Sequence, residues 1–394
     1  MSGTNTKSVY NTFRYLMKGT MKIIADENIP FVKECFSSAG NVTTVHGRKI
    51  SKDILQDADA LLVRSITKVN KDLLEGTNIK FVATATIGFE HIDIEYLKSK
   101  NIGFASAPGS NANSVAEYIT SALLNLAEKY HFDISKKSIG IVGVGNVGSR
   151  VEKKAKAIGM KVVINDPPLK RQTGDEKYRP LDEIFDCDIV TLHTPLTKEG
   201  IDKTYHLADE NFFAALKDGT IFFNTCRGSV HDTATLKKAI AAKKLSACVL
   251  DVWEKEPDID VELLDMVDFG TPHIAGYSYD GKVLGMIMIY EAFCRFFNIQ
   301  SKHTAKDFLP PAQIPKISIK NEKSPLLYAV NALYNISKDD ANLRLMKNEP
   351  ADKRGAYFDS LRKNYPVRRE FPNTKVLTDS KMLKNILEGI GFRV

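Results

Sequence analysis

The stretch GIVGVGNVGSR, residues 140–150, decides the fold class of this 394-residue chain. It contains Gly143, Gly145 and Gly148, which follow a short apolar run and precede a charged segment suited to a helix. A strand, a glycine-rich turn and a helix in this order build the phosphate-binding unit of dinucleotide-binding α/β domains. We therefore predict a parallel α/β sheet whose first turn of this kind holds a dinucleotide.

Each position of the turn has a physical task. Gly143 permits the tight turn, Gly145 lets the backbone approach a pyrophosphate, and Gly148 lets the helix pack closely on the strand. The helix is expected to start at Asn146 and to direct its N–H groups and partial positive charge at the phosphates. Asp166, 18 residues beyond Gly148, is expected to accept hydrogen bonds from the ribose hydroxyls.

The carboxylate of Asp166 would repel a 2′-phosphate, and the sequence therefore favours NAD over NADP. Two nearby cations, Lys170 and Arg171, weaken this preference. The alternative is a structural glycine turn in an α/β unit that binds nothing.

Short apolar runs alternate with helical segments on both sides of this turn, which is typical of parallel α/β sheets. The predicted strands lie within residues 22–27, 58–65, 79–88 and 102–109, and within 161–166, 187–195, 219–228, 246–253 and 267–276. Helices are expected near 30–39, over 110–130 with Asn111 or Asn113 as its cap, and over 282–298.

Charge and composition restrict the classes of partner that this chain is expected to bind. The chain carries a net charge of +7, and residues 301–394 contain 18 Lys and Arg against 10 Asp and Glu, which is +8. This excess is either a solvated surface or a face for an anionic ligand or partner subunit. No motif supports nucleic-acid binding. Residues 1–20 lack an apolar signal core and are expected to be a disordered extension.

The cysteines and the hydropathy point to a reduced, cytoplasmic setting. Five cysteines are scattered without C-x-x-C spacing, so we expect free thiols and no metal site. No apolar run reaches the roughly 18 residues of a membrane span.

Three further stretches supply candidate catalytic residues: NTCRGS (224–229), DVWEKEP (251–257) and TPHIAG (271–276). Each lies at or just after a predicted strand end. Because the carboxyl ends of parallel strands meet at one edge of the sheet, Arg227, Glu256 and His273 are predicted to converge there.

This trio suits the oxidation of an alcohol. Histidine titrates near neutral pH and can take the hydroxyl proton, and a carboxylate beside it orients the ring and favours the imidazolium. Arginine can hold a substrate carboxylate in a two-point fork. Taken singly, Arg227 could form a structural salt bridge, His273 could be a loop histidine, and Glu256 could be a solvated carboxylate.

The chain resembles the D-isomer-specific 2-hydroxyacid dehydrogenases over residues 21–300, through GIVGVGNVGSR, HTPLT, NTCRGS, LDVWEKEP and PHIAG. Further stretches narrow the resemblance to a branch of that family with a phosphorylated substrate: MKIIADENIP, DALLVRSITKVN, FVATATIGFEHID, NDPP, HIAGYSYDGK and LRKNYPVRRE.

The resemblance implies roles for individual residues. Arg227 would bind the substrate carboxylate, His273 would be the acid/base, and Glu256 would pair with His273. Substrate-binding positions would be Ser65, Thr86 and Tyr277. The NAD site would comprise Gly143, Gly145, Asn146, Val147, Gly148, Asp166, Thr194, Thr225, Cys226, Asp251 and Gly276.

The family also implies an architecture of two Rossmann-like doubly wound parallel-sheet domains with a cleft between them, plus a smaller C-terminal α/β dimerisation domain. Residues 21–112 and 276–300 would form the substrate-side domain, 113–275 the NAD domain, and 301–394 the dimerisation domain of a homodimer. The substrate would be a small phosphorylated hydroxy acid. Two rival interpretations stay open: an enzyme for another acid such as 3-phosphoglycerate, and a non-enzymatic NAD-sensing protein on the same scaffold.

Overall fold

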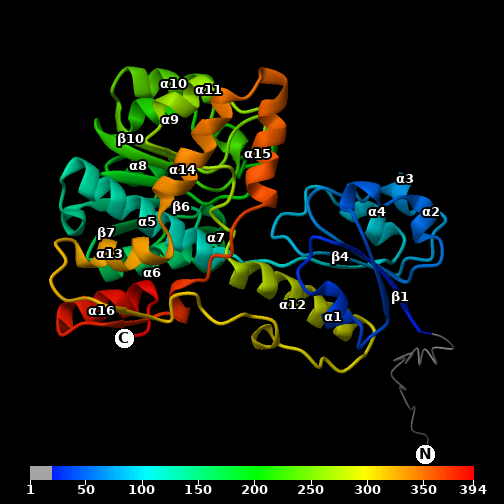
Figure 1. Ribbon diagram of the computed structural model, residues 1–394. Helices are drawn as coiled ribbons and strands as arrows, with labels where there is room; N and C mark the ends of the chain where they lie inside the picture. The colour runs from blue at the N-terminus through cyan, green and yellow to red at the C-terminus, as the bar shows by residue number, and fades with distance from the viewer. Residues whose placement is uncertain (1–19) are drawn as a thin grey trace, which may run out of the picture. The chain divides into compact units, whose positions relative to one another are not determined.

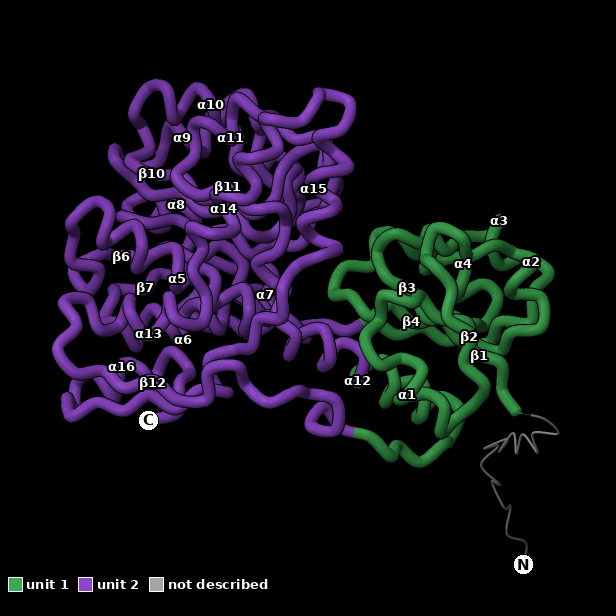
Figure 2. Tube along the Cα trace, in the orientation of Figure 1, with its two compact units in different colours: residues 1–106, 288–303 green, residues 107–287, 304–394 purple. Residues whose placement is uncertain are grey.

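The computed structural model describes residues 20–394, so the extension expected at 1–20 lies almost wholly outside the described residues. The chain divides into two compact units (Figure 2). Of the described residues, the first unit comprises 20–106 and Met288–His303, and the second comprises Ala107–Ile287 and Thr304–Val394. In the part of the chain that the structure describes, no helix is both long and apolar enough to cross a membrane.

The first unit is built on a five-stranded parallel sheet in the order β2-β1-β3-β4-β5. Its strands are β1 (Lys22–Asp26), β2 (Asn41–Val45), β3 (Ala60–Val63), β4 (Phe81–Thr84) and β5 (Gly103–Ala105). Its helices are α1 (Val32–Phe36), α2 (Lys52–Leu55), α3 (Lys71–Leu74), α4 (Ile94–Ser99) and the C-terminal half of α12 (Tyr279–Phe296). Every residue of β3 and β4 is buried, as expected for a parallel sheet covered on both faces.

The second unit contains a six-stranded parallel sheet in the order β11-β10-β9-β8-β6-β7. Its strands are β6 (Ser138–Val142), β7 (Lys161–Asn165), β8 (Ile189–Leu192), β9 (Thr220–Asn224), β10 (Leu245–Leu250) and β11 (Phe269–Gly270). The chain reverses direction across the sheet between β6 and β8, which is where doubly wound sheets bind ligands. The predicted parallel α/β fold is confirmed.

Helices cover both faces of this sheet (Figure 1). One face carries α5 (Ala112–Tyr130) and α6 (Gly148–Ile158); the other carries α8 (Leu181–Phe185), α9 (Glu210–Ala215), α10 (Thr233–Ala241) and α11 (Val261–Met266). Successive residues of a strand point to opposite faces of the sheet, so Phe222 packs in the hydrophobic core on one face and Phe223 in the core on the other.

Three local predictions differ from the structure. Helix α6 begins at Gly148 instead of Asn146, because residues 143–147 are used for the turn. Asn111 occupies the N-cap of α5 without a capping hydrogen bond from its side chain. The strand expected over 267–276 is only the two-residue β11, because the chain then turns sharply at His273.

The C-terminal segment shares its core with the six-stranded sheet. Its strands β12 (Lys316–Ser318) and β13 (Lys375–Leu377) pair in parallel. Its helices are α13 (Pro325–Leu333), α14 (Ile336–Arg344), α15 (Arg354–Lys363) and α16 (Lys381–Ile390). Helix α13 packs on α5 and α16 packs on α6, and the apolar face of α16 joins the core beneath β6 (Figure 1).

A buried cluster of charges ties this segment to α5 and α6. The carboxylate of Glu117 is fully buried and accepts hydrogen bonds from Asn113 Nδ2 (2.9 Å) and the Phe371 N–H (2.8 Å). Burial, followed by the charge of Glu370, raises the pKa of Glu117 to about 8, against the opposing charges of Lys154 and Arg368. Glu117 is therefore largely protonated in the folded protein at neutral pH.

We expect Glu117→Gln to stabilise the protein relative to wild type more at pH 8 than at pH 5. Between its ordinary pKa of 4.5 and the folded value of about 8, Glu117 keeps its proton only in the folded state. Wild-type stability then falls as pH rises, by at most ~1.4 kcal/mol per pH unit, and glutamine removes this dependence. Thermal unfolding at both pH values measures the effect, and a variant that gains nothing on going to pH 8 would contradict the prediction.

Candidate active site

The three predicted catalytic residues follow neighbouring strands. Strand β9 ends at Asn224, β10 at Leu250 and β11 at Gly270, and these strands lie side by side in the sheet. Arg227, Glu256 and His273 therefore all follow the same carboxyl edge of the sheet.

Asn224 shapes the turn that carries Arg227. Its side chain accepts a hydrogen bond from the Cys226 N–H and donates one to the Arg227 carbonyl, both at 3.0 Å. A Cβ at Gly228 would lie 1.9 Å from the Trp253 carbonyl oxygen, so only glycine allows this close approach. The turn of Arg227 is thereby held against the backbone of the loop that carries Glu256.

The backbone of His273 is held in an unusual conformation. Its φ is 58°, in the left-handed region that costs a residue with a side chain about 1–2 kcal/mol. The fully buried carboxylate of Asp251 accepts hydrogen bonds from the Ile274 N–H (2.7 Å), the Ala275 N–H (2.9 Å) and the Thr271 hydroxyl (2.6 Å). These bonds, with the His273 N–H donated to the Asp251 carbonyl (2.8 Å), fix the turn.

Burial raises the pKa of Asp251, although the charge of His273 and the hydrogen bonds of the turn oppose the rise. The bonds described for the Asp251 carboxylate stay within this turn, so its visible task is to support His273.

Glu256 and His273 are in direct contact. Glu256 Oε2 lies 2.8 Å from His273 Nδ1, and Oε1 accepts a bond from the Trp253 N–H at 2.8 Å. Burial of Glu256 works against its charge, but His273, the Trp253 N–H and Arg362 together hold the pKa of Glu256 below its ordinary value. Because an ionised carboxylate only accepts hydrogen bonds, Nδ1 carries the hydrogen and Nε2 is left for a substrate.

The three glycines of the glycine-rich turn lie in different surroundings. Gly143 has a φ of 88°, and a Cβ there would lie 2.8 Å from the His193 carbonyl oxygen. A Cβ at Gly148 would lie 2.0 Å from the Gly143 oxygen, whereas nothing lies within 4 Å of the Cβ position of Gly145. Gly143 and Gly148 therefore serve packing, and Gly145 faces open space that suits a cofactor phosphate.

Asp166 follows β7, and its side chain is hydrogen-bonded to the glycine-rich turn. Its Oδ2 accepts a hydrogen bond from the Val144 N–H (2.8 Å), and its Oδ1 caps α7 (Pro167–Thr173) through the Leu169 N–H (3.0 Å). Each oxygen retains a lone pair for a ribose hydroxyl.

Three further positions predicted for NAD, Thr194, Thr225 and Cys226, lie close to His193. The sequence reasoning missed this histidine, although it is the first residue of HTPLT. His193 Nδ1 lies 3.4 Å from the Thr225 hydroxyl, and the Thr194 hydroxyl lies 4.0 Å from Cys226 Sγ. Burial lowers the pKa of His193 to about 3, which keeps its imidazole neutral. A Cβ at Gly276 would lie 2.0 Å from Asn111 Nδ2, so this glycine serves packing.

The predicted substrate residues fall in both units. In the first unit, Ser65 is exposed just after β3, and the Thr86 hydroxyl, just after β4, donates to the Gly88 carbonyl (2.8 Å). In the second unit, the Tyr277 ring lies 5.9 Å from the Arg362 guanidinium carbon and 4.6 Å from Lys282 Nζ.

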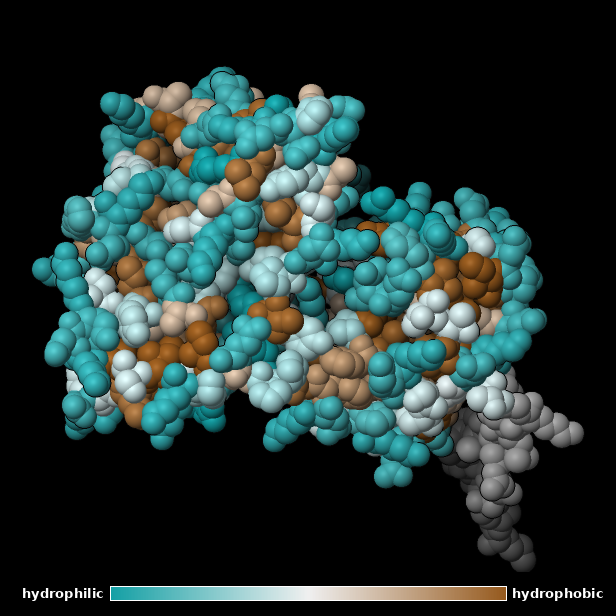
Figure 3. Space-filling view, in the orientation of Figure 1, coloured by the Kyte–Doolittle hydropathy of each residue, from teal (hydrophilic) through white to brown (hydrophobic). Residues whose placement is uncertain are grey.

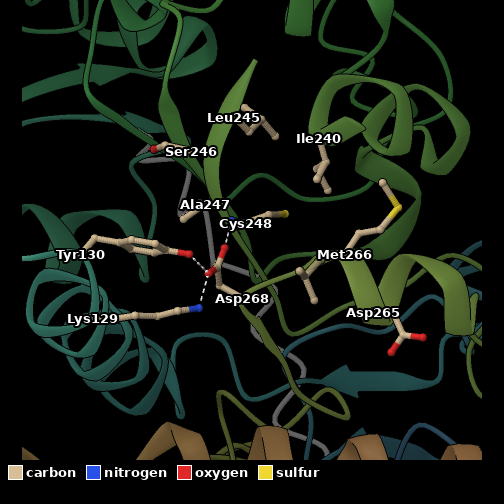
Figure 4. A pocket seen from close by; sticks show the side chains of 11 residues that line it. Lys129, Tyr130, Ile240, Leu245, Ser246, Ala247, Cys248, Asp265, Met266 and Asp268 are labelled. Carbon is tan, nitrogen blue, oxygen red and sulfur yellow. Dashed lines mark hydrogen bonds and ion pairs between the residues drawn. The ribbon is translucent and has the colours of Figure 1, made fainter. Parts of the chain in front are cut away.

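A cluster of polar side chains and a cavity lie outside the set of predicted site residues. His206 Nε2 contacts Glu254 Oε1 at 2.8 Å, and its Nδ1 lies 3.6 Å from Asp232 Oδ2. A cavity of about 330 Å³ is bordered by Lys129, which lies 2.6 Å from Asp268 (Figure 4). This cavity sits where β10 and β11 begin, at the edge of the sheet opposite the candidate active site.

Known proteins are similar to this chain in sequence and in fold. A curated protein from Cronobacter sakazakii, named erythronate-4-phosphate dehydrogenase, is 45% identical over 375 residues, which cover 94% of this chain and 98% of the relative. Residues 114–275 match the family model of the D-isomer specific 2-hydroxyacid dehydrogenase NAD binding domain. The chain belongs to the D-isomer-specific 2-hydroxyacid dehydrogenase family. Residues 308–391 match a domain of unknown function.

Solved structures agree with this assignment. A D-lactate dehydrogenase from Aquifex aeolicus complexed with NAD and lactic acid has a TM-score of 0.59 and 27% identity, covering 70% of this chain and 95% of its own. An NAD⁺-bound 3-phosphoglycerate dehydrogenase from Entamoeba histolytica has a TM-score of 0.61 and 26% identity, covering 71% and 96%.

The two unlike glycines of this dehydrogenase turn should respond differently to alanine. We expect Gly148→Ala to lower the melting temperature, because its Cβ would overlap the Gly143 oxygen and such overpacking costs about 1–3 kcal/mol. We expect Gly145→Ala to retain wild-type stability and to bind NAD more weakly, because its methyl group would occupy the open space. Thermal unfolding and calorimetric NAD titration measure the two effects; undiminished NAD affinity in Gly145→Ala would contradict the prediction.

Proposed function

We propose that this enzyme catalyses the NAD-dependent oxidation of 4-phospho-D-erythronate to (R)-3-hydroxy-2-oxo-4-phosphobutanoate, a step of pyridoxal 5′-phosphate (vitamin B6) biosynthesis. The 2.8 Å contact between His273 Nδ1 and Glu256 carries this proposal, because it leaves Nε2 as a base for a substrate hydroxyl. The name of the curated relative supports the choice of substrate.

NAD, when bound, accepts the hydride that leaves the substrate carbon. His273 Nε2 takes the hydroxyl proton and returns it in the reverse direction. The imidazolium that forms is stabilised by Glu256, which is ionised already and accepts the Nδ1 hydrogen bond. Asp251 keeps the ring in place through the bonded turn beneath it.

Arg227 is proposed to bind the substrate carboxylate through its guanidinium and to polarise the adjacent reacting carbon. The turn locked by Gly228 supports this role, because it places the arginine beside the loop of Glu256. We propose Ser65, Thr86 and Tyr277 as substrate-binding residues. The NAD-binding set is proposed to comprise Gly143, Gly145, Asn146, Val147, Gly148, Asp166, Thr194, Thr225, Cys226, Asp251 and Gly276.

The finer domain division at residues 112, 275 and 300 stays a prediction.

The five free cysteines are all buried, which supports a cytoplasmic setting.

We expect the protein to be a homodimer in solution. Apolar residues reach the surface over α13 and α16 (Figure 3), where Tyr328 and Met382 are 48% and 73% exposed. A second subunit would remove such side chains from water. Sedimentation equilibrium at micromolar concentration measures the mass, and a purely monomeric species would contradict the prediction.

The purified protein should reduce NAD in the presence of 4-phospho-D-erythronate, with NADH formation followed at 340 nm. We expect His273→Ala to lose about 10²–10⁴-fold in kcat, the usual contribution of a general base. The same variant should bind NAD as wild type does, because the glycine-rich turn lies on β6, away from β11.

The outcomes separate the rival functions. A higher kcat/KM for 3-phosphoglycerate would replace the proposed substrate. NAD binding without turnover of any hydroxy acid would favour the NAD-sensing protein. Unchanged turnover in His273→Ala would remove the histidine from the proton transfer.

A further inference from the structure

The C-terminal segment touches the candidate active site from two sides. A Cβ at Gly355 of α15 would lie 2.5 Å from Asp258 Oδ1, so α15 packs closely against the loop that follows Glu256. Beyond α15, Arg368 donates to the Ala275 carbonyl (3.1 Å), two residues after His273. The domain of unknown function therefore supports the loops of both members of the Glu256–His273 pair.

Tyr277 meets the same segment. The Tyr365 ring lies edge-on to it, with centroids 5.8 Å apart and planes at 86°. The Arg362 guanidinium stands over the same ring, 5.9 Å from its centroid. An arginine of α15 is thus placed at a residue proposed to bind substrate.

Arg362 has unused capacity to bind an anion. Its side chain is 26% exposed, and its one described acidic partner, Asp359, lies 3.6 Å away on the same helix. Its Nε is buried without a hydrogen-bond partner among the described residues. Burial opposes the charge of Arg362, but Tyr277 and Glu256 raise its pKa above the ordinary value, so it is always a cation. A partly buried guanidinium with an unpaired Nε–H is stabilised by an anionic ligand.

We propose that Arg362 is a specificity-determining residue that binds the phosphate of the substrate, from its position over the ring of Tyr277. This inference rests on the proposed function, in which Arg227 takes the carboxylate and the far end of the acid needs a second cation. Arg362 lies in the domain of unknown function at 308–391.

An indirect role makes a different prediction. Since Arg362 also acts on Glu256 electrostatically, its loss could disturb the proton transfer at His273. That disturbance would slow phosphorylated and unphosphorylated acids alike. Loss of a phosphate contact lowers kcat/KM only for the phosphorylated acid.

The experiment compares wild type, Arg362→Gln, Arg362→Lys and the control Lys363→Gln on 4-phospho-D-erythronate and on D-erythronate. Lys363 is the exposed neighbour on the same helix, so its neutralisation removes the same charge away from Tyr277. We expect Arg362→Gln to lower kcat/KM on the phosphorylated acid about 10- to 100-fold further than on D-erythronate, mainly through KM. Arg362→Lys should fall between, and Lys363→Gln should equal wild type.

Each outcome decides the proposal. Equal losses on both acids would show that Arg362 acts through Glu256, and the proposal would be wrong; an unchanged preference for the phosphorylated acid would overturn it as well. Should Arg362→Gln fail to fold, Arg362→Lys supports the same comparison, since it retains the charge and loses the two-point fork. Wild type that ignores 4-phospho-D-erythronate would overturn the proposed function itself, which the wild-type assay reveals before any variant is measured.

Discussion

The buried carboxylate of Asp251 is the constraint on which the candidate active site depends. It accepts three hydrogen bonds from the turn at residues 271–275 and so offsets the cost of the left-handed backbone at His273. With the backbone fixed, the ring meets Glu256 at 2.8 Å. The imidazole of His273 is therefore positioned by the carboxylate of Asp251, which accepts the hydrogen bonds of its turn.

Contacts between residues far apart in the chain also join the C-terminal segment to the candidate active site. Helices α13 and α16 complete the core beside α5 and α6, while Arg368 and Glu370 bond to the turn of residues 275–278. A segment that shares its hydrophobic core with the six-stranded sheet cannot detach without exposing apolar surface to water. Its influence on the loops near His273 is a consequence of that shared packing.

Much of the fold was predictable because its signals are local. Gly148 is required by the Gly143 carbonyl oxygen five residues earlier, and Gly143 is favoured by its own φ of 88°, so both signals are local. The start of α6 and the capping of α5 were predicted wrongly, because the residues of a turn and the partners of Asn111 are set by tertiary packing. The neutral His193 was missed for the same reason, since its burial depends on neighbouring strands.

By itself the sequence determined the parallel α/β class and the glycine-rich turn, because the alternation of strands and helices along the chain and short-range steric limits appear as local sequence patterns. It also determined that Arg227, Glu256 and His273 follow strand ends at one edge of the sheet. Only the tertiary structure decided that Asp251 supports the histidine turn and that Arg362 stands over Tyr277. Those contacts join residues far apart in the chain, and their free energy comes from burial and charge that exist only after the core has packed.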